Sequence, residues 1–326
     1  MIKKLTAILM TLTMCIGMTA CSSTSDKEQV TVYTSVPQDL ADEFKAKFEE
    51  KNPEVNVNIY RATSNEILTK LQTEADSGQV SGDVLWVADF ASADSLKELN
   101  LLEKYTSSED AAIDATYKDA DGYYYGSRLI NMVLAYNTQI KAPKSWNDLT
   151  SKALANKVGV PSVNSGSAFQ YVGVMSENKE FGWDFFEKVK KNGALQFKAN
   201  KDVLQRIATG EILAGPVLDY MVTDMKAQGS PVDFVVPQEG AIAVASPIAK
   251  IANCKNPALA EKFIDFTLSK EGQEILASMN TTPVRTDVKT SNNTLSIDNT
   301  KIMEDTKGYL SNSNEVKSKF TSIFGE

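Results

Sequence analysis

Small hydroxyl and carboxylate side chains stand directly after short apolar runs that have the composition of β-strands, and residues placed in this way could bind an anion. The residues concerned are Thr34, Ser35, Thr63, Ser64, Asp89, Ser165, Gly166, Ser167, Asp219 and Tyr220. A helix that follows such a strand presents free N–H groups and a partial positive charge in its first turn. The pattern therefore indicates a binding site for a small anionic solute.

The stretch NSGSA at 164–168 is the most informative of these places, because a glycine between two serines precedes a helix-like run. Elsewhere a second reading stays open. Ser35 and Ser64 could be helix caps, and Asp89 could cap the helix that follows it. The arginines Arg61 and Arg128 could each reach a ligand or form a structural ion pair.

The chain has no histidine, which excludes several kinds of catalytic and metal site. Ser-His-Asp and Cys-His catalysis, histidine general bases and histidine zinc sites cannot be built. Cys254 lies in the stretch KIANCKNP, where we predict a small apolar packing residue and not a nucleophile. No nucleophile–base pair stands out and no cofactor is expected, so an extracellular hydrolase and a purely structural lipoprotein are the weaker alternatives to a binding protein.

The first 21 residues have the order of an export signal. Lys3 and Lys4 precede an apolar run over 5–18, which small residues and then Cys21 follow. The run is too short for an ordinary membrane span. The order resembles the bacterial lipoprotein signal, although Met18 stands where that signal prefers leucine. We expect residues 1–20 to be removed, Cys21 to be lipidated and 21–29 to form a tether; an ordinary cleaved signal is the alternative.

Composition limits the classes of partner. A chain of 326 residues that is 42% hydrophobic can form two domain cores. Its formal net charge is −8 and it has no basic tract, so nucleic acid is a poor partner. We expect a monomer anchored on the outer face of the cell membrane.

Strand-like and helix-like runs alternate along most of the chain, which predicts βαβ units and a parallel α/β sheet. We expect strands over 30–34, 55–60, 83–87, 130–136, 158–161, 213–218, 234–236 and 241–244. We expect helices over 37–51, 64–75, 91–99, 181–192, 202–209, 220–227, 257–269, 271–279 and 315–323, a further helix after 164–168, and a short helical stretch at 145–157. Leu40, Phe44 and Phe48 fall on one face of the first helix.

Several stretches in this order carry a family resemblance. They include VTVYTSVPQDLADEF, GDVLWVADFASADSLKELNLLEKYT, DGYYYGSRLINMVLAYNTQI, GEILAGPVLDYM and NTTPVRTD, with 143–175 and 245–276 between them. The chain resembles the extracellular solute-binding proteins of ABC importers, within the branch for ferric ion, sugar phosphates and phosphonates. The resemblance covers essentially the whole chain after the signal.

The resemblance implies a fold of two α/β lobes that close like a hinged trap, of the type II periplasmic-binding-protein class. Crossing strands are expected near 131–137 and 240–246. Lobe one would comprise 30–130, lobe two 131–240, and 241–326 would return to lobe one and end in helices. Membrane subunits of an ABC permease are the implied partner.

The resemblance also bears on the ligand. Ferric members of the family place two adjacent tyrosines after the strand equivalent to 213–218 and add a histidine. Here the matching stretch is Leu218-Asp219-Tyr220-Met221, and methionine is a poor ligand for a hard ion. We therefore expect a phosphonate, such as an aminoalkylphosphonate, or a sugar phosphate, with ferric ion as the alternative. Asp89 and Asp219 would bind an amine or hydroxyl groups of that solute.

Overall fold

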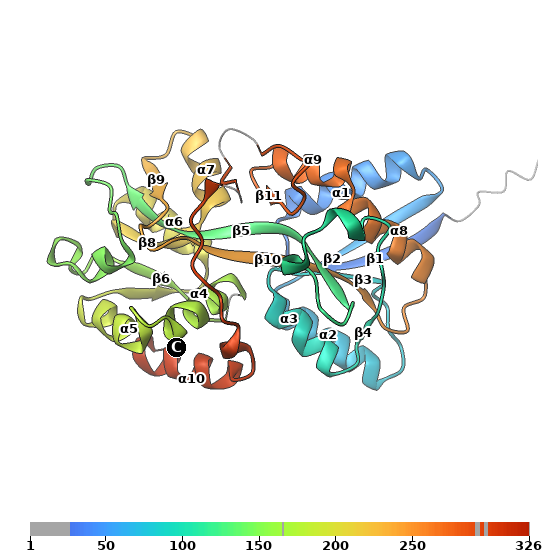
Figure 1. The fold of residues 1–326 in the computed structure, drawn as a ribbon, viewed down its shortest axis with the longest axis horizontal. Helices are drawn as coiled ribbons and strands as arrows, with labels where there is room; N and C mark the ends of the chain where they lie inside the picture. Colours follow the sequence, from blue (N-terminus) through green and yellow to red (C-terminus); the bar gives the residue numbers. More distant parts are fainter. Residues whose placement is uncertain (1–26, 165, 291–293, 297–298, 326) are drawn as a thin grey trace, which may run out of the picture.

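The chain folds into two α/β lobes joined by long strands that run from one lobe into the other (Figure 1). The structure is a computed structural model that describes residues 27–164, 166–290, 294–296 and 299–325. The lipidation candidate Cys21 and the candidate Ser165 lie outside these residues. Among the helices within these ranges, none is both long enough and apolar enough to cross a membrane.

Lobe one is built on parallel strands, as the alternating pattern predicts. Its elements are β1 (Glu28–Thr34), α1 (Gln38–Lys51), β2 (Val55–Arg61), α2 (Ser64–Asp76), β3 (Val84–Trp86), α3 (Phe90–Glu98), β4 (Leu102–Glu103), η1 (Asp110–Ala112), η2 (Ala115–Tyr117), α8 (Pro257–Leu268), α9 (Lys270–Ser278) and β11 (Thr282–Pro283). Strand β1 pairs in parallel with both β2 and β3. The carboxyl ends of these three strands therefore lie at one edge of the sheet.

The core of lobe one confirms the predicted face of α1. Phe44 and Phe48 are fully buried, and the ring of Phe44 packs edge-on against Trp86 with centroids 5.0 Å apart. Helix α8 adds Phe263, whose ring centroid lies 5.2 Å from that of Phe48. Cys254 packs half-buried against the same core, and burial raises the pKa of its thiol to about 11, as expected for a packing residue.

Lobe two repeats the arrangement with shorter strands. Its elements are η3 (Trp146–Thr150), η4 (Lys152–Leu154), β6 (Gly159–Pro161), α4 (Gly166–Glu177), α5 (Gly182–Lys191), β7 (Leu195–Phe197), α6 (Asn200–Thr209), β8 (Ala214–Leu218), α7 (Asp219–Ala227), β9 (Val232–Val235), η6 (Gly308–Leu310) and α10 (Ser313–Phe324). Strand β7 pairs in parallel with β6 and was not predicted, because three residues are too few for a periodic pattern.

The hinge consists of β5 (Tyr124–Asn137) and β10 (Ile242–Ile251), which pair antiparallel over most of their length. Both strands are longer than predicted. The prediction ended this strand at 244, three residues before Pro247, which cannot donate a ladder hydrogen bond. The structure accommodates this proline at a shift of register between Ser246 and Pro247, and the strand continues beyond it.

After β11 the described residues of the chain pass from lobe one to lobe two a third time, and we call residues 284–290, 294–296 and 299–303 the third crossing. Val284 belongs to the core of lobe one, whereas Met303 and Phe320 belong to the core of lobe two. Figure 1 shows the dark-red stretch that leads to η6 passing in front of β5 and β10. The expectation that everything after 241 returns to lobe one therefore does not hold for α10, because its apolar face packs against α4 and α5.

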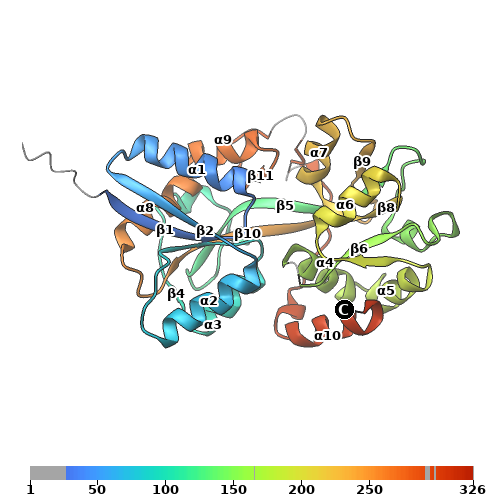
Figure 2. The same ribbon diagram turned by 180° about the vertical axis from the view of Figure 1, so that it is seen from behind.

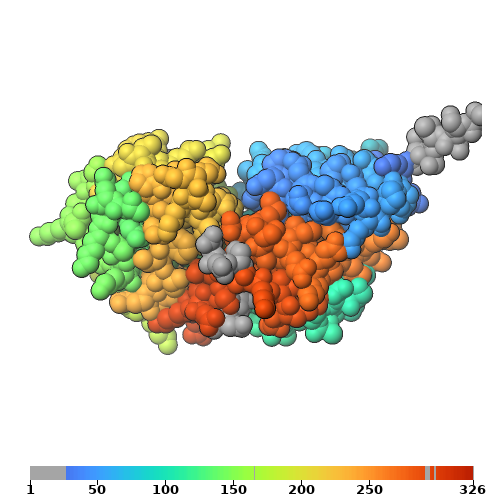
Figure 3. Space-filling model, turned by 90° about the horizontal axis from the view of Figure 1, so that it is seen from above, coloured from blue at the N-terminus to red at the C-terminus, as the bar shows by residue number. Residues whose placement is uncertain are grey.

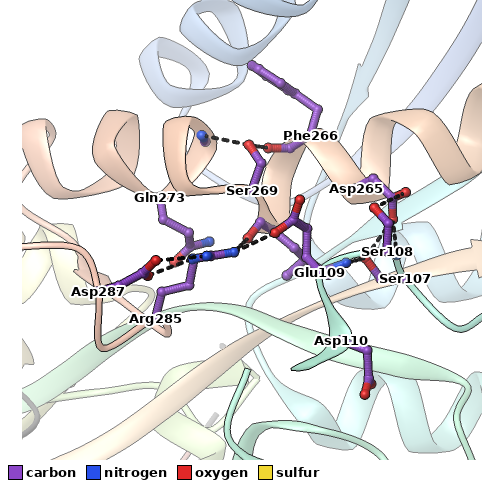
Figure 4. Close-up of polar contacts among 12 residues, drawn as sticks. Ser107, Ser108, Glu109, Asp110, Asp265, Phe266, Ser269, Gln273, Arg285 and Asp287 are labelled. Atoms are coloured by element: carbon purple, nitrogen blue, oxygen red, sulfur yellow. Dashed lines mark hydrogen bonds and ion pairs between the residues drawn. The ribbon is translucent and has the colours of Figure 1, made fainter. Parts of the chain in front are cut away.

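Buried ionic contacts anchor the start of this crossing to lobe one (Figure 4). The Arg285 guanidinium donates to Glu109 at 2.6 Å and to Asp287 at 2.8 and 2.9 Å. Asp265 of α8 accepts hydrogen bonds from the hydroxyls of Ser107 and Ser108. These contacts attach the 107–110 loop and residue 285 to the same side of lobe one.

Candidate functional site

A cleft between the lobes is the place where the strand ends of both lobes face each other. Figure 3 shows it as a deep notch between the blue surface of lobe one and the yellow-orange surface of lobe two, and Figure 2 looks toward the same side. The helices that begin at this edge are α1, α2 and α3 from lobe one and α4, α6 and α7 from lobe two. Their N-terminal N–H groups favour an anion there.

On the wall of lobe one, two of the four hydroxyl candidates are already used by the fold. The Thr34 hydroxyl donates to the Trp86 carbonyl at 2.7 Å and accepts from the Val36 N–H, so it joins β1 to β3. Thr63, not the predicted Ser64, is the N-cap of α2, because its hydroxyl accepts from the Glu66 N–H while Glu66 closes a capping box.

Ser35 and Ser64 remain as the hydroxyls that can face a ligand. Their Oγ atoms lie 3.2 Å apart, at the ends of β1 and at the start of α2. Arg61, at the end of β2, donates from Nε to the Val36 carbonyl at 2.7 Å. Arg61 thus fixes the loop that carries Ser35, and within the part of the chain that the structure describes its other guanidinium nitrogens donate no further hydrogen bond.

Asp89 caps α3, and it also meets lobe two. Its Oδ1 accepts from the Ser92 N–H at 3.0 Å, and the side chain is 2% exposed. A Cβ added to Gly166 would lie 1.8 Å from Asp89 Oδ2, so the carboxylate lies against the first turn of α4. Burial raises the pKa of Asp89. The predicted cap is confirmed, and the glycine of the NSGSA stretch permits the close approach of the two lobes.

On the wall of lobe two, Ser167 and Asn200 form a buried pair. The Asn200 Nδ2 donates to the Ser167 Oγ at 2.9 Å, and each residue is at most 4% exposed. The Asn200 Oδ1 has no hydrogen-bond partner among the described residues. The sequence analysis did not identify Asn200. This residue begins α6, which follows β7 after two intervening residues, and β7 was too short to predict.

An electrostatic interaction also connects the two walls of the cleft. Glu66 at the start of α2 has a pKa below its usual range because Thr63 donates hydrogen bonds to it, and the positive charge of Lys198 in lobe two contributes. Lys198 is exposed and stands just before α6. The N-terminus of α2 therefore faces the N-terminus of α6.

Arg128 lies where the hinge strand β5 meets Tyr220 and Asp219 of lobe two, and its environment is the least expected of the candidate residues. It lies on β5, it is 2% exposed, and its Nε and Nη1 atoms have no hydrogen-bond partner among the described residues. Its guanidinium carbon lies 5.9 Å from the centroid of the Tyr220 ring. Burial lowers the pKa of Arg128, and the nearby charges of Asp219 and Asp39 only partly oppose that effect.

Asp219 lies beside Arg128 at the start of α7 and holds the hinge strand. Its carboxylate accepts from the Asn131 N–H at 3.0 Å, the Asn131 Nδ2 at 2.8 Å and the Tyr220 N–H at 2.9 Å. Burial raises the pKa of Asp219 to about 6, against the effect of these donors and of Arg128. Three of the roughly four acceptor positions of the carboxylate are occupied, so one position is left for a ligand.

Metal-binding chemistry has little support in the cleft. No group of three or more His, Cys, Asp or Glu side chains that could hold a metal ion occurs within 27–164, 166–290, 294–296 and 299–325. Tyr220 is 9% exposed, and burial raises the pKa of its phenol to about 12. A phenol must lose its proton to bind ferric ion well, and Met221 supplies no hard oxygen ligand.

Two α/β lobes, hinge strands between them and polar helix N-termini along the cleft define a hinged solute-binding protein. The chain belongs to the family of bacterial extracellular solute-binding proteins, whose model matches residues 43–303. This family consists of receptors and not of enzymes.

Similar proteins differ in the solute that their names give. The molybdate-binding protein ModA of Mycobacterium tuberculosis is 26% identical over 71% of this chain and 75% of its own length. The fold matches the ferric-binding protein of Campylobacter jejuni with a TM-score of 0.79 at 22% identity, over 90% of this chain and 99% of that one. It matches AfuA of Actinobacillus pleuropneumoniae, with fructose 6-phosphate bound, with a TM-score of 0.81 at 22% identity, over 91% and 99%. At these identities the two structures show the fold alone.

Proposed function

We propose that this protein is the outer-face receptor of an ABC importer and that it captures a small solute with a phosphonate or phosphate group. The solute would bind in the cleft with its anion over Arg128 and within reach of Ser35, Ser64 and Ser167. Closure of the lobes would enclose it, and the closed receptor would deliver it to the membrane permease.

The observation that supports an anionic solute is the buried guanidinium of Arg128. Its Nε and Nη1 atoms have no hydrogen-bond partner among the described residues. Taking an arginine out of water without a partner costs several kcal/mol, and native proteins rarely leave such a group unpaired. Nε and Nη1 lie on different edges of the guanidinium, so a phosphonate or phosphate group would have to accept from each of them with a separate oxygen or leave one of them to another group of the solute. The fold itself gains nothing from leaving these donors empty, which favours a role for them in binding.

Acceptors lie next to these donors. The Asn200 Oδ1, beside Ser167, has no hydrogen-bond partner among the described residues, and Asp219, beside Arg128, has one acceptor position left. An ammonium group or sugar hydroxyls would donate to these oxygens. An aminoalkylphosphonate carries both an anion and an ammonium group, and a sugar phosphate, the class of ligand named for AfuA, carries an anion and hydroxyl groups.

A ferric receptor is the second candidate, and the fold match to the Campylobacter jejuni protein favours it. A ferric receptor and a phosphonate receptor would differ in colour when loaded, because ferric ion bound to a tyrosinate absorbs visible light. We expect the protein to stay colourless when it is mixed with ferric ion. Tight ferric binding with a visible absorption band would replace the phosphonate proposal.

The proposal is tested by titration calorimetry with 2-aminoethylphosphonate, fructose 6-phosphate and ethanolamine, which carries the amine alone. We expect heat from at least one of the two phosphorus compounds and none from ethanolamine. Ser167→Ala should weaken that binding by about 1–3 kcal/mol if a hydrogen bond to a charged group is lost. Asp184→Ala, on an exposed position of α5, is the matched control. If Ser167→Ala and Arg128→Met both bind either solute as the wild type does, the proposed site is wrong.

The anchor at Cys21 and the monomeric state belong to the same proposal. The order of residues 3–21 supports lipidation, and it would keep the receptor beside its permease. A single acyl chain binds a membrane only weakly, so stable anchoring needs more than one chain.

A further inference from the structure

A second cavity lies between the hinge strands and the third crossing. It has a volume of about 290 Å³, and its lining residues come from both lobes, from β5 and β10 and from the crossing itself. Of the cleft residues, Asp89 reaches it, whereas Arg128, Ser167, Asn200 and Tyr220 do not line it.

Aromatic rings form much of the wall. They belong to Phe90, Tyr117, Tyr124, Phe169 and Tyr309. The rings of Phe90 and Tyr124 pack with centroids 4.9 Å apart, and those of Phe169 and Tyr309 with centroids 5.6 Å apart. One pair comes from lobe one and the other from lobe two, so the cavity has an aromatic wall on each side.

Three carboxylates also line the cavity, and their hydrogen-bond donors are neutral. Asp89 accepts from Ser92, and Asp94 accepts from the Tyr124 hydroxyl at 2.6 Å. Asp305 accepts from the Gln170 amide at 3.1 Å and from the Tyr309 hydroxyl at 3.2 Å. Among the described residues, none of the three carboxylates forms an ion pair within 4.0 Å. Burial raises the pKa of each of them, in keeping with negative charge that lacks a close counter-ion.

The chain itself already places an ammonium group against this wall. Lys307 lines the cavity, and its Nζ lies 5.6 Å from the centroid of the Phe90 ring. A second ammonium group, that of Lys317, lies 5.2 Å from the centroid of the Phe169 ring, and Lys97 near Asp94 is paired with Asp119 and Asp121. Two ammonium groups against three carboxylates leave an excess of negative charge at the cavity. The electrostatic field and the ring faces therefore both favour a further cation over an anion or a neutral molecule.

We propose that this cavity is a second ligand site, distinct from the solute cleft, and that it binds a small organic ammonium ion with an apolar body. The apolar body lies between the two aromatic walls, and the ammonium group lies toward Asp94 and Asp305. Because both lobes contribute to the walls, this ligand is bound by the arrangement of lobes that the structure shows.

The probe for the test is 2-phenylethylammonium, and 2-phenylethanol is its neutral partner of nearly the same shape. We expect the ammonium probe to bind the purified protein at one site and at least about tenfold more tightly than the alcohol, which corresponds to about 1.4 kcal/mol. Asp94→Asn and Asp305→Asn should each weaken the ammonium probe about fivefold or more and change binding of the alcohol less than about twofold. Asp184→Asn, which removes an exposed carboxylate on α5, should change neither.

Variants of the solute cleft separate this proposal from the proposed function. Ser167→Ala and Arg128→Met should leave binding of 2-phenylethylammonium unchanged, whatever they do to phosphonates. Loss of the ammonium probe in these variants but not in Asp94→Asn would place the probe in the solute cleft and overturn the second site. Equal binding of the amine and the alcohol, or no binding of either at millimolar concentration, would also overturn it.

Discussion

At the scale of single residues, Arg128 is a charge that the fold does not need. We expect Arg128→Met to keep the fold and to leave the free energy of unfolding of the ligand-free protein unchanged or raise it by about 1 kcal/mol, because apolar replacement of buried ionic groups is often stabilising. Affinity for the anionic solute should fall by about 2–5 kcal/mol, because a buried charge pair cannot form.

Urea unfolding and titration calorimetry on the same preparation measure both quantities. Arg206→Met removes an exposed arginine that pairs with Glu211, and it should change neither by much. A large loss of stability in Arg128→Met without loss of affinity would show that the guanidinium serves the fold.

Asp219 should make stability depend on pH. Its pKa is raised to about 6 in the folded protein, above the usual value of 3.8. The folded state therefore binds the proton more tightly, so this stabilisation is complete below pH 3.8 and is lost as pH rises through about 6. In Asp219→Asn the fall in unfolding free energy between pH 4 and pH 7 should be smaller by roughly 1–3 kcal/mol.

Chemical unfolding at a series of pH values checks this difference. The pKa values of Asp89, Asp94 and Asp305 are also raised, so these groups add to the pH dependence of the unfolding free energy in both proteins. The difference between the wild type and Asp219→Asn isolates the contribution of Asp219. Parallel curves for the two proteins would show that Asp219 is not the titrating group.

At the scale of elements, the contact between α3 and α4 limits how far the lobes can close. Ala at position 166 would place its Cβ 1.8 Å from Asp89 Oδ2 and 2.6 Å from its Cγ. Either the Asp89 side chain gives up its capping hydrogen bond with the Ser92 N–H, or the two lobes stay further apart. We expect Gly166→Ala to fold normally and to bind the solute about tenfold more weakly or worse, since the closed state is disfavoured.

The double variant Gly166→Ala with Asp89→Ala tests the cause. Removing the carboxylate removes the clash, so the double variant should recover closure even if it loses the cap. Gly308→Ala is a control for the substitution itself, because its nearest neighbour is the far end of the flexible Glu177 side chain. If the double variant binds no better than Gly166→Ala, the clash does not govern closure.

At the scale of the whole molecule, ligand should bring the two lobes together. The structure has contacts across the cleft that an open form would lose, such as the bond from Asn280 Nδ2 to Asp224 Oδ1 at 2.8 Å. We expect solution scattering to show a smaller radius of gyration when the solute is bound. At 100 times its dissociation constant the solute should add about 2.7 kcal/mol to the stability. A verified solute that changes neither scattering nor unfolding would contradict the trap mechanism.

Attachment to the membrane is a separate property of the whole molecule. Because a lipidated Cys21 would hold the receptor at the membrane, Cys21→Ala should release it into the soluble fraction. Fractionation of cells that express each form measures this, with Cys254→Ala as the control cysteine. Retention of Cys21→Ala on the membrane after cleavage would rule out the anchor.

Much of the fold could be predicted from the sequence because it depends on local patterns. Alternating apolar residues and helical spacing located most strands and helices of both lobes, and α1 buries the predicted residues. The strands that the prediction missed include β4, β7 and β11, and it also missed the first part of β5 and the part of β10 beyond Pro247. Short strands and bulged strands are stabilised by partners far away in the chain, and a local pattern does not contain those partners.

For the candidate site, the sequence by itself determined which residue types are available: hydroxyls and carboxylates at strand ends, and no histidine. Only the tertiary structure decided their roles. The hydroxyls of Thr34 and Thr63 form hydrogen bonds within lobe one. Ser167 accepts a hydrogen bond from Asn200, and Asn131 occupies two of the acceptor positions of the Asp219 carboxylate. The tertiary structure also buries Arg128 with no hydrogen-bond partner for Nε and Nη1 among the described residues. Hydrogen-bond partners and burial are set by contacts between distant segments, which residue spacing along the chain does not specify.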